Sequence, residues 1–192
     1  MAGTSQYYSS AVDDDGGLDN RAESIEIPYN DNLLIQGFRS IHGVENYLNI
    51  PYGRITARFC IAEMVRLEKL RGRLDASRYG PRAPQGPDTL QPLLAHMMER
   101  RSNTQRMSEM DCLNVNVYTP PDSISSAPFP ILGFIHGGGF VAGDSLTEFD
   151  GNHLVKRSLD IGKPVVVITI SYRLNFFGFF ASHEILDEQE AR

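Results

Sequence analysis

Three consecutive glycines follow directly on a short apolar run, in residues 131–143 with the sequence ILGFIHGGGFVAG. Because glycine lacks a Cβ atom, such a run lets the backbone turn sharply and leaves its N–H groups uncovered. Uncovered N–H groups can bind an anion. In acyl transfer the substrate carbonyl oxygen becomes negatively charged in a tetrahedral intermediate, and each fixed N–H donor stabilises it by about 2.7–4 kcal/mol. The segment therefore has the residue types of an oxyanion-binding loop.

Two apolar runs on either side of this loop predict the elements that position it. Residues 130–135 and 164–170 are short and rich in Ile and Val, which is typical of central strands covered on both faces. Between them, Asp150 or Asn152 can cap a helix that ends at Gly162. The expected buried face of that helix holds Leu154, Val155, Ser158 and Leu159. A right-handed crossover of this kind makes the two strands parallel neighbours or near neighbours in an α/β sheet.

The earlier part of the chain predicts antiparallel strands. Residues 33–38 and 47–50 have the pattern of a hairpin, and residues 89–101 that of a short helix. Residues 112–119 alternate with the period of a half-buried strand. One face of that strand holds Leu113, Val115 and Val117, and the other holds Asn114, Asn116 and Tyr118.

The charge is uneven along the chain. Residues 1–31 hold seven acids and one base, whereas the remainder carries 17 of each sign, for a net charge of −6. Because the start is polar and lacks the features of a secretory signal, we expect residues 1–31 to be an acidic, disordered leader of a cytoplasmic protein. A neutral body with an acidic leader argues against nucleic acid or anionic lipid as a partner. No apolar run approaches the roughly 18 residues that span a bilayer.

The cysteines and histidines form no recognisable metal site. Cys60 and Cys112 could make at most one disulfide, and a cytosolic setting would keep both reduced. The histidines are scattered through the sequence and lack ligand spacing: His42, His96, His136, His153 and His183. We therefore expect no metal and no cofactor.

Several segments, in a fixed order, resemble the N-terminal part of a type B carboxylesterase, in the cholinesterase and carboxylesterase branch of the α/β-hydrolases. These segments are NIPYG at 49–53, RF at 58–59, LDASRYGP at 74–81, SEMDCLNVNVY at 108–118, HGGGF at 136–140 and VITISYRLNFFG at 167–178. The resemblance implies a partial α/β-hydrolase fold over residues 32–192. In that fold, early antiparallel strands lead into a mainly parallel twisted sheet. The implied activity is hydrolysis of a small-molecule carboxylic ester by a serine nucleophile.

The resemblance also assigns roles by position. Gly138 and Gly139 match the backbone donors of the family's oxyanion hole. His136 shapes that loop and is not matched to the catalytic base. Arg58 and Glu109 match a family salt bridge that ties the first strands to the loop before residues 112–119, although two solvated surface charges are the alternative.

Further residues of these motifs have expected structural or pocket roles. Arg173 is expected to anchor the end of its strand through hydrogen bonds. Three aromatic residues could line the acyl pocket or belong to the core: Phe140, Phe176 and Phe177.

The family's catalytic triad is absent from these 192 residues. Its serine lies on a G-x-S-x-G turn and is followed by an acid and a histidine, and no G-x-S-x-G occurs here. We therefore expect the N-terminal part of an enzyme, truncated before the nucleophile and inactive alone. The family also contains non-catalytic, cholinesterase-like adhesion proteins, so an interaction role is the alternative from another class.

A second hydrolase motif must be weighed at residues 143–147, GDSLT, which reproduces the motif of GDSL hydrolases with Ser145 as nucleophile. Asp150 and His153 even have the spacing of that family's DxxH. However, five residues separate Ser145 from Asp150, whereas in GDSL enzymes the two motifs lie at opposite ends of the domain. The interpretation of Ser145 as a loop or cap residue is therefore preferred.

Two departures from the carboxylesterase pattern limit the substrate. The family's early disulfide joins the cysteine of the DCL segment to one at the position of Ala83, so Cys112 has lost its expected partner. Cys60 is the alternative partner, but a reduced, buried Cys112 thiol is the preferred interpretation. Tryptophan is absent, and cholinesterases use a Trp before the DCL segment to bind quaternary ammonium. A neutral carboxylic ester is therefore favoured over a choline ester.

Overall fold

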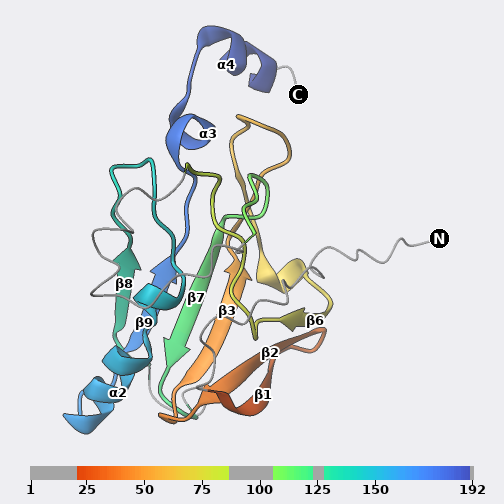
Figure 1. Ribbon diagram of the computed structural model, residues 1–192. Coiled ribbons are helices and arrows are strands. Elements are labelled where there is room, and N and C mark those ends of the chain that lie inside the picture. The colour runs from red at the N-terminus through yellow and green to blue at the C-terminus, as the bar shows by residue number, and fades with distance from the viewer. Residues whose placement is uncertain (1–20, 87–105, 123–127, 191–192) are drawn as a thin grey trace.

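A seven-stranded mixed sheet forms the centre of the computed structural model, which describes residues 21–86, 106–122 and 128–190. Its strand order is β1-β2-β3-β7-β9-β8, with β6 beside β2 (Figure 1). The strands are β1 (Arg21–Asn30), β2 (Leu33–Ser40), β3 (Glu45–Pro51), β6 (Gly72–Asp75), β7 (Asn114–Thr119), β8 (Ile131–Ile135) and β9 (Val166–Ile170). A separate two-stranded sheet pairs β4 (Gly53–Arg54) with β5 (Glu63–Met64).

Most of the described strand pairs are antiparallel. The β1–β2, β2–β3, β3–β7 and β7–β9 pairs are antiparallel, whereas β2–β6 and β8–β9 are parallel. The expected hairpin of residues 33–38 and 47–50 is confirmed in β2 and β3, and the predicted parallel crossover is confirmed in β8 and β9. The antiparallel pairs of β1, β2, β3 and β7 therefore precede the parallel β8–β9 pair, as expected, but β6 also lies parallel to β2 and the described sheet is mixed rather than mainly parallel.

The described residues include five helical segments: η1 (Leu67–Lys69), η3 (Thr147–Phe149), α2 (Asn152–Asp160), α3 (Asn175–Phe179) and α4 (His183–Glu190). Helices α3 and α4 lie beyond one end of the sheet, past the carboxyl ends of β8 and β9 (Figure 1). None of the helices in the described ranges is both long and apolar enough to cross a bilayer. The helix expected at residues 89–101 lies outside the described residues.

Helix α2 begins where the sequence predicted. The Asn152 N–H donates to Asp150 Oδ1 at 2.6 Å, although the N-cap residue itself is Gly151. Val155 and Ser158 are buried, whereas Leu154 and Leu159 are exposed. The predicted buried face was therefore only half right. Val155 packs in a cluster with five residues of the sheet and its turns: Phe38, Val44, Leu48, Tyr118 and Val167.

Strand β1 corrects the expected extent of the disordered leader. Residues 21–30 pair with β2 over its whole length, and Ile25 and Ile27 pack against the core cluster beneath the sheet. Two acids of this strand form ion pairs: Glu23 lies 3.2 Å from Arg39, and Glu26 pairs with Arg73. Alternation of Ile with paired charges makes this acidic segment a strand, so the prediction that residues 21–30 are disordered was wrong. Residues 1–20 lie outside the described residues.

Strand β7 buries its polar face more deeply than its apolar face. Asn114, Asn116 and Tyr118 are fully buried, whereas Val115 and Val117 are only partly buried. The sequence correctly predicted the alternation of the two faces, but the face that is more deeply buried is the polar one. Hydrogen bonding explains the difference, because a buried amide is tolerated where all its groups find partners.

Asn116 makes such a set of hydrogen bonds across the sheet. Its Nδ2 donates to Ser145 O at 2.6 Å and to Thr169 Oγ1 at 3.1 Å, and its Oδ1 accepts from the Asn49 N–H at 3.1 Å. Asn49 has a φ of 56°, an unusual conformation for a residue other than glycine. Asn116 therefore joins the bend in β3, strand β9 and the chain that follows the glycine loop.

Strand β8 is exposed, which corrects the expectation of two central strands. All five of its residues are exposed, with Ile131 at 67% and Ile135 at 68%. Of these two strands, only β9 is interior, since it pairs with β7 on one side and β8 on the other. Within the described residues β8 forms an edge of the sheet, so its apolar composition did not reveal its position.

We predict that Asn116→Ala lowers the free energy of unfolding by about 2–4 kcal/mol, because it leaves the N–H of half-buried Asn49 and the carbonyl of buried Ser145 without their partner. Chemical denaturation followed by circular dichroism measures the loss. The matched control is Asn32→Ala, since Asn32 is an exposed turn residue, and it should change stability by less than about 0.5 kcal/mol. Equal effects of the two substitutions would contradict the role given to Asn116.

Buried thiol and phenol groups predict a loss of stability in alkali. Burial raises the pKa of the Cys112 thiol to about 11 and that of Tyr52 to about 12, and it raises the pKa of Tyr79 well above its usual value. The unfolded chain loses these protons first, so it binds fewer protons than the folded chain above about pH 9. The free energy of unfolding should therefore be unaffected by these groups below about pH 9 and should fall as the pH rises toward 11.

Urea denaturation at pH 8, 9, 10 and 11 checks this pH dependence. Tyr52→Phe removes one titrating group, so its stability should fall less steeply above pH 10 than that of the unsubstituted chain. A free energy of unfolding that stays constant up to pH 11 would contradict the assignment.

Candidate functional site

The glycine loop, residues 136–143, leaves the carboxyl end of β8 in left-handed backbone conformations. Gly138 has a φ of 118°, Gly139 of 61° and Gly143 of 117°, values that L-residues with side chains rarely adopt. Phe140 also has a positive φ, of 64°. A Cβ atom added to Gly138 would lie 1.9 Å from the carbonyl oxygen of Ala142. The glycines are therefore required by the path of the backbone.

Hydrogen bonds to two carbonyl groups orient the peptides of this loop. The Gly138 carbonyl accepts from the Val141 N–H at 3.1 Å and from the Ala142 N–H at 3.2 Å. Because a trans peptide is planar, with its C=O and N–H pointing in opposite directions, these bonds direct the Gly139 N–H away from the turn. The Gly137 carbonyl lies 2.9 Å from His136 Nδ1, which fixes the direction of the Gly138 N–H in the same way.

The N–H groups of Gly138 and Gly139 are therefore oriented, and they are not used by the fold within the described residues. Both residues are exposed. Neither N–H donates a hydrogen bond to any residue of the described ranges. Two neighbouring, fixed and unused donors have the chemistry to bind a developing oxyanion.

His136 is a buried part of the loop. Its ring stacks on Tyr172, with centroids 4.3 Å apart and an angle of 13° between the planes. The Tyr172 hydroxyl donates to the His136 carbonyl at 2.8 Å. A donor bond from Nδ1 to Gly137 requires a proton on that nitrogen. His136 thus acts within the structure as a support for the loop.

The far end of the loop is held by a different segment, residues 81–85. Gln85 accepts a hydrogen bond from the Gly143 N–H and donates one to the Gly143 carbonyl, each at 2.9 Å. Next to it, Asp144 is buried and lies 3.5 Å from Arg82. The middle of the loop is held by Asn175, whose N–H donates to the Phe140 carbonyl at 2.7 Å.

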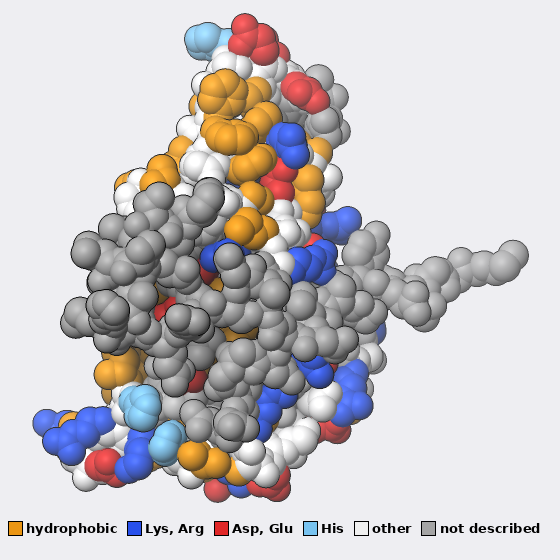
Figure 2. Space-filling view, in the orientation of Figure 1, with side chains coloured by type: hydrophobic (Ala, Val, Ile, Leu, Met, Phe, Trp, Pro, Cys, Tyr) orange, Lys and Arg blue, Asp and Glu red, His pale blue; other side chains and the backbone are white. Residues whose placement is uncertain are grey.

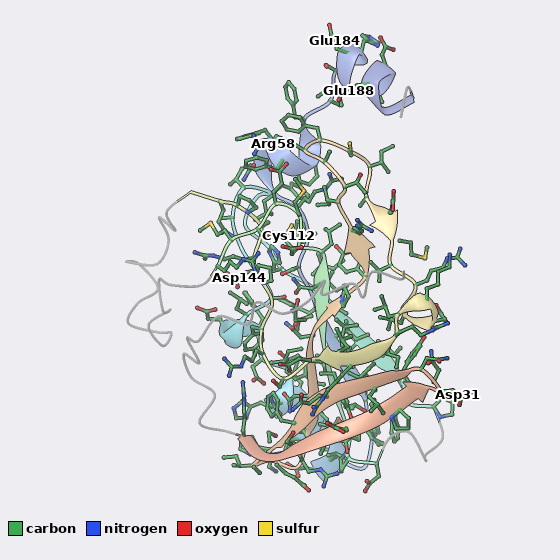
Figure 3. The ribbon with its side chains drawn as sticks, turned by 90° about the vertical axis from the view of Figure 1, so that its right-hand side faces the viewer. Asp31, Arg58, Cys112, Asp144, Glu184 and Glu188 are labelled. Carbon is green, nitrogen blue, oxygen red and sulfur yellow. The ribbon has the colours of Figure 1, made fainter. Side chains whose placement is uncertain are left out.

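Two predicted structural contacts are confirmed. Arg58 Nε donates to Glu109 Oε2 at 2.9 Å, so the ion pair forms. Arg58 lies beside α3 (Figure 3), with its guanidinium 5.3 Å from the ring centre of Phe177. Arg173 donates to the Cys60 carbonyl at 2.8 Å, which is the anchoring role expected for it.

Of the two alternatives for the aromatic residues near the loop, a place in the core does not fit Phe140 and Phe176. Phe140 is 62% exposed and Phe176 is 56% exposed, so neither belongs to a core among the described residues. Phe140 contacts Phe179 of α3, with ring centroids 5.1 Å apart. Figure 2 shows the resulting gathering of hydrophobic side chains over α3. Phe177 is half-buried.

The structure does not assemble the GDSL-type site. Ser145 is buried, and its hydroxyl lies 2.9 Å from the hydroxyl of Ser171. His153 is exposed at the start of α2 and contacts the ring of His42. Asp150 accepts hydrogen bonds from Asn152. Ser145 is therefore a buried loop residue, as the preferred interpretation had it.

The cysteine positions match the departure noted in the sequence. Cys112 and Ala83 belong to one buried cluster, and both Cys60 and Cys112 are free thiols. Ala83 thus lies in the same core cluster as Cys112, but as an alanine it cannot form a disulfide with Cys112. The described residues contain no group of three or more His, Cys, Asp or Glu side chains able to bind a metal.

Sequence reasoning missed the supports of the loop. Tyr172 and Asn175 lie inside the SYRLN motif, and Gln85 follows the YGP motif by four residues. Their side chains carry no intrinsic chemistry for acyl transfer, so only their position in these motifs could have marked them. The predicted donors Gly138 and Gly139 do lie together at the carboxyl end of the parallel pair.

Comparisons with known proteins match the chain to the family that its sequence motifs resemble. The family model described as "Carboxylesterase family" matches residues 32–189. Lipase 2 of Diutina rugosa is 40% identical over 81 residues, which are 42% of this chain and 15% of the lipase. Carboxylesterase 1D of Rattus norvegicus is 36% identical over 108 residues, which are 56% of this chain and 18% of that protein. The matched part is thus less than a fifth of these relatives.

Solved structures share the fold. A thermophilic PNB esterase superposes with a TM-score of 0.65 at 30% identity, over 87% of this chain and 31% of the esterase. EstA of Aspergillus niger superposes with a TM-score of 0.61 at 25% identity, over 81% of this chain and 27% of EstA.

We predict that Gly138→Ala distorts the loop and lowers the free energy of unfolding by about 1–3 kcal/mol, because the methyl group meets the Ala142 carbonyl at a strained φ. Gly137→Ala is the matched control, since nothing lies within 4 Å of its added Cβ atom, and it should stay within about 0.5 kcal/mol. Thermal denaturation of the two variants makes the comparison. Similar stabilities for the two variants would contradict the left-handed backbone conformation at Gly138.

Proposed function

Because the chain belongs to the carboxylesterase family, we propose that residues 32–192 supply the oxyanion hole of a carboxylic ester hydrolase. Gly138 and Gly139 are the proposed donors. Their backbone N–H groups bind the substrate carbonyl oxygen as it becomes an alkoxide in the tetrahedral intermediate. The observation that supports the proposal is that both N–H groups are oriented by their own peptide carbonyls and donate to no described residue.

Preorganisation is the source of the proposed rate effect. A donor that must turn toward the developing charge loses part of its benefit to reorganisation, whereas a fixed donor does not. The loop meets this need, because Tyr172 supports its start, Asn175 its middle and Gln85 its end. Each donor would contribute about 2.7–4 kcal/mol to transition-state stabilisation.

The nucleophile, acid and base belong, in this proposal, to residues other than these 192. No G-x-S-x-G turn occurs in the sequence, and Ser145 is buried beside Ser171. Without a nucleophile, the two donors stabilise a charge that nothing generates. The chain alone is therefore proposed to have no specific esterase turnover.

The proposed substrate is a small, neutral carboxylic ester. The exposed ring contact between Phe140 and Phe179 offers apolar surface beside the two donors. The sequence has no tryptophan, so this part of the protein offers no Trp face for a quaternary ammonium group.

We predict that ethyl methylphosphonate, a tetrahedral monoanion, binds at Gly138 and Gly139. In protein labelled with 15N glycine, these two amide resonances should shift together and saturably at millimolar phosphonate. Gly138→Ala should abolish the shifts, and Gly137→Ala should retain them. Absent shifts, or shifts of similar size over many glycines, would contradict the proposed oxyanion hole.

A turnover assay tests the remainder of the proposal. With p-nitrophenyl acetate, the 192-residue chain and its Ser145→Ala variant should both hydrolyse the ester at the rate of heat-denatured protein. Saturable turnover that Ser145→Ala removes would instead support the GDSL-type alternative.

A further inference from the structure

Gln85 holds the end of the glycine loop with both halves of its side-chain amide. Its Oε1 accepts from the Gly143 N–H and its Nε2 donates to the Gly143 carbonyl, both at 2.9 Å. Nε2 also donates to the Ala83 carbonyl at 3.2 Å. A side chain that pairs with the donor and the acceptor of one residue fixes both the position and the orientation of that residue's backbone.

The segment that carries Gln85 is itself anchored on two sides. The Arg82 N–H donates to the Arg106 carbonyl at 3.1 Å, and the Arg82 carbonyl accepts from the Ser108 N–H at 3.0 Å. On the other side, the Pro84 carbonyl accepts from Asn175 Nδ2 at 2.7 Å. Gln85 therefore extends from a fixed base.

Gly143 transmits this restraint to both proposed donors. Its neighbour Ala142 donates to the Gly138 carbonyl, and that bond sets the direction of the Gly139 N–H. Gly143 also packs against the ring of His136, since a Cβ atom added to it would lie 2.3 Å from Nδ1. The same Nδ1 holds the Gly137 carbonyl, which sets the direction of the Gly138 N–H.

We propose that Gln85 is a positioning residue, which orients the N–H groups of Gly138 and Gly139 by fixing Gly143. This inference rests on the proposed function for its purpose, but its structural content does not depend on any turnover. Gln85 touches no reacting atom and acts only through the loop.

The first test is Gln85→Met, which preserves side-chain length and removes all three hydrogen bonds. In protein labelled with 15N glycine, the amide hydrogen of Gly143 should exchange about tenfold faster. The amide order parameters of Gly138 and Gly139 should fall from about 0.85 to below about 0.6. The matched control is Gln36→Met on β2, since Gln36 Nε2 donates to the Ser24 hydroxyl at an exposed site, and it should leave the loop resonances unchanged.

The second test is rescue by protonation in Gln85→Glu. An ionised carboxylate accepts from the Gly143 N–H but cannot donate to the Gly143 carbonyl, whereas a protonated carboxyl group can do both. Loop order in this variant should therefore be low at pH 7 and should return toward that of the unsubstituted chain below the usual Glu pKa of about 4.3. Each value is compared with the unsubstituted chain at the same pH, because that chain carries the same neighbouring His136, Arg82 and Asp144.

Unchanged Gly138 and Gly139 order in Gln85→Met would overturn the proposal, and so would equal disorder of Gln85→Glu at both pH values. A role in packing alone predicts no recovery at low pH. The outcome is separate from that of the phosphonate experiment. Phosphonate binding without any effect of Gln85→Met removes the positioning role only, whereas an ordered, Gln85-dependent loop that binds no phosphonate removes the proposed function only.

Discussion

The hydrogen bonds that Val141 and Ala142 donate to the Gly138 carbonyl fix the plane of one peptide, and the candidate site depends on that plane. A peptide group cannot present its N–H and its C=O on the same side. Securing the carbonyl inside the turn therefore leaves the Gly139 N–H pointing outward. The Gly137 carbonyl, held by His136, repeats the arrangement for the Gly138 N–H. Both require backbone that only glycine adopts readily.

The remainder of the described fold supplies fixed attachments for this loop. Its start follows the parallel pair of β8 and β9, and its end continues into Ser145, which Asn116 of β7 holds by hydrogen bonds to its carbonyl and hydroxyl oxygens. Two segments that are far apart in the sequence meet at the loop: one contributes Gln85, and the other contributes Tyr172 and Asn175. Hydrogen bonds, rather than apolar packing, attach the loop to the sheet. The buried face of β7 therefore carries asparagine, because Asn116 makes these bonds to Ser145.

Local patterns were sufficient for much of the fold. Short apolar runs with a capped helix between them predicted β8, α2 and β9, because strand and helix periods differ and the crossover has one hand. Burial was harder to predict. The composition of β8 resembles that of an interior strand, but its exposure depends on which segments lie beside it. Strand β1 was missed because its acids suggested disorder, whereas Arg39 and Arg73 pair with them.

The candidate site was also only partly predictable from the sequence. The glycines were evident from sequence, since a triple glycine after a strand has few structural uses. Gln85 was not evident, because its importance lies in a contact made 58 residues later in the chain, and the sequence left open whether Phe140 lies in the core or lines a pocket. Long-range hydrogen bonds and the solvent exposure of aromatic side chains are properties of the assembled structure.

A crystal structure of the chain with ethyl methylphosphonate would test the central claim most directly. We expect one phosphonyl oxygen to accept hydrogen bonds from both the Gly138 and the Gly139 backbone nitrogens, at about 2.7–3.1 Å. A phosphonate bound only to cationic side chains elsewhere, with both N–H groups unoccupied, would contradict the account.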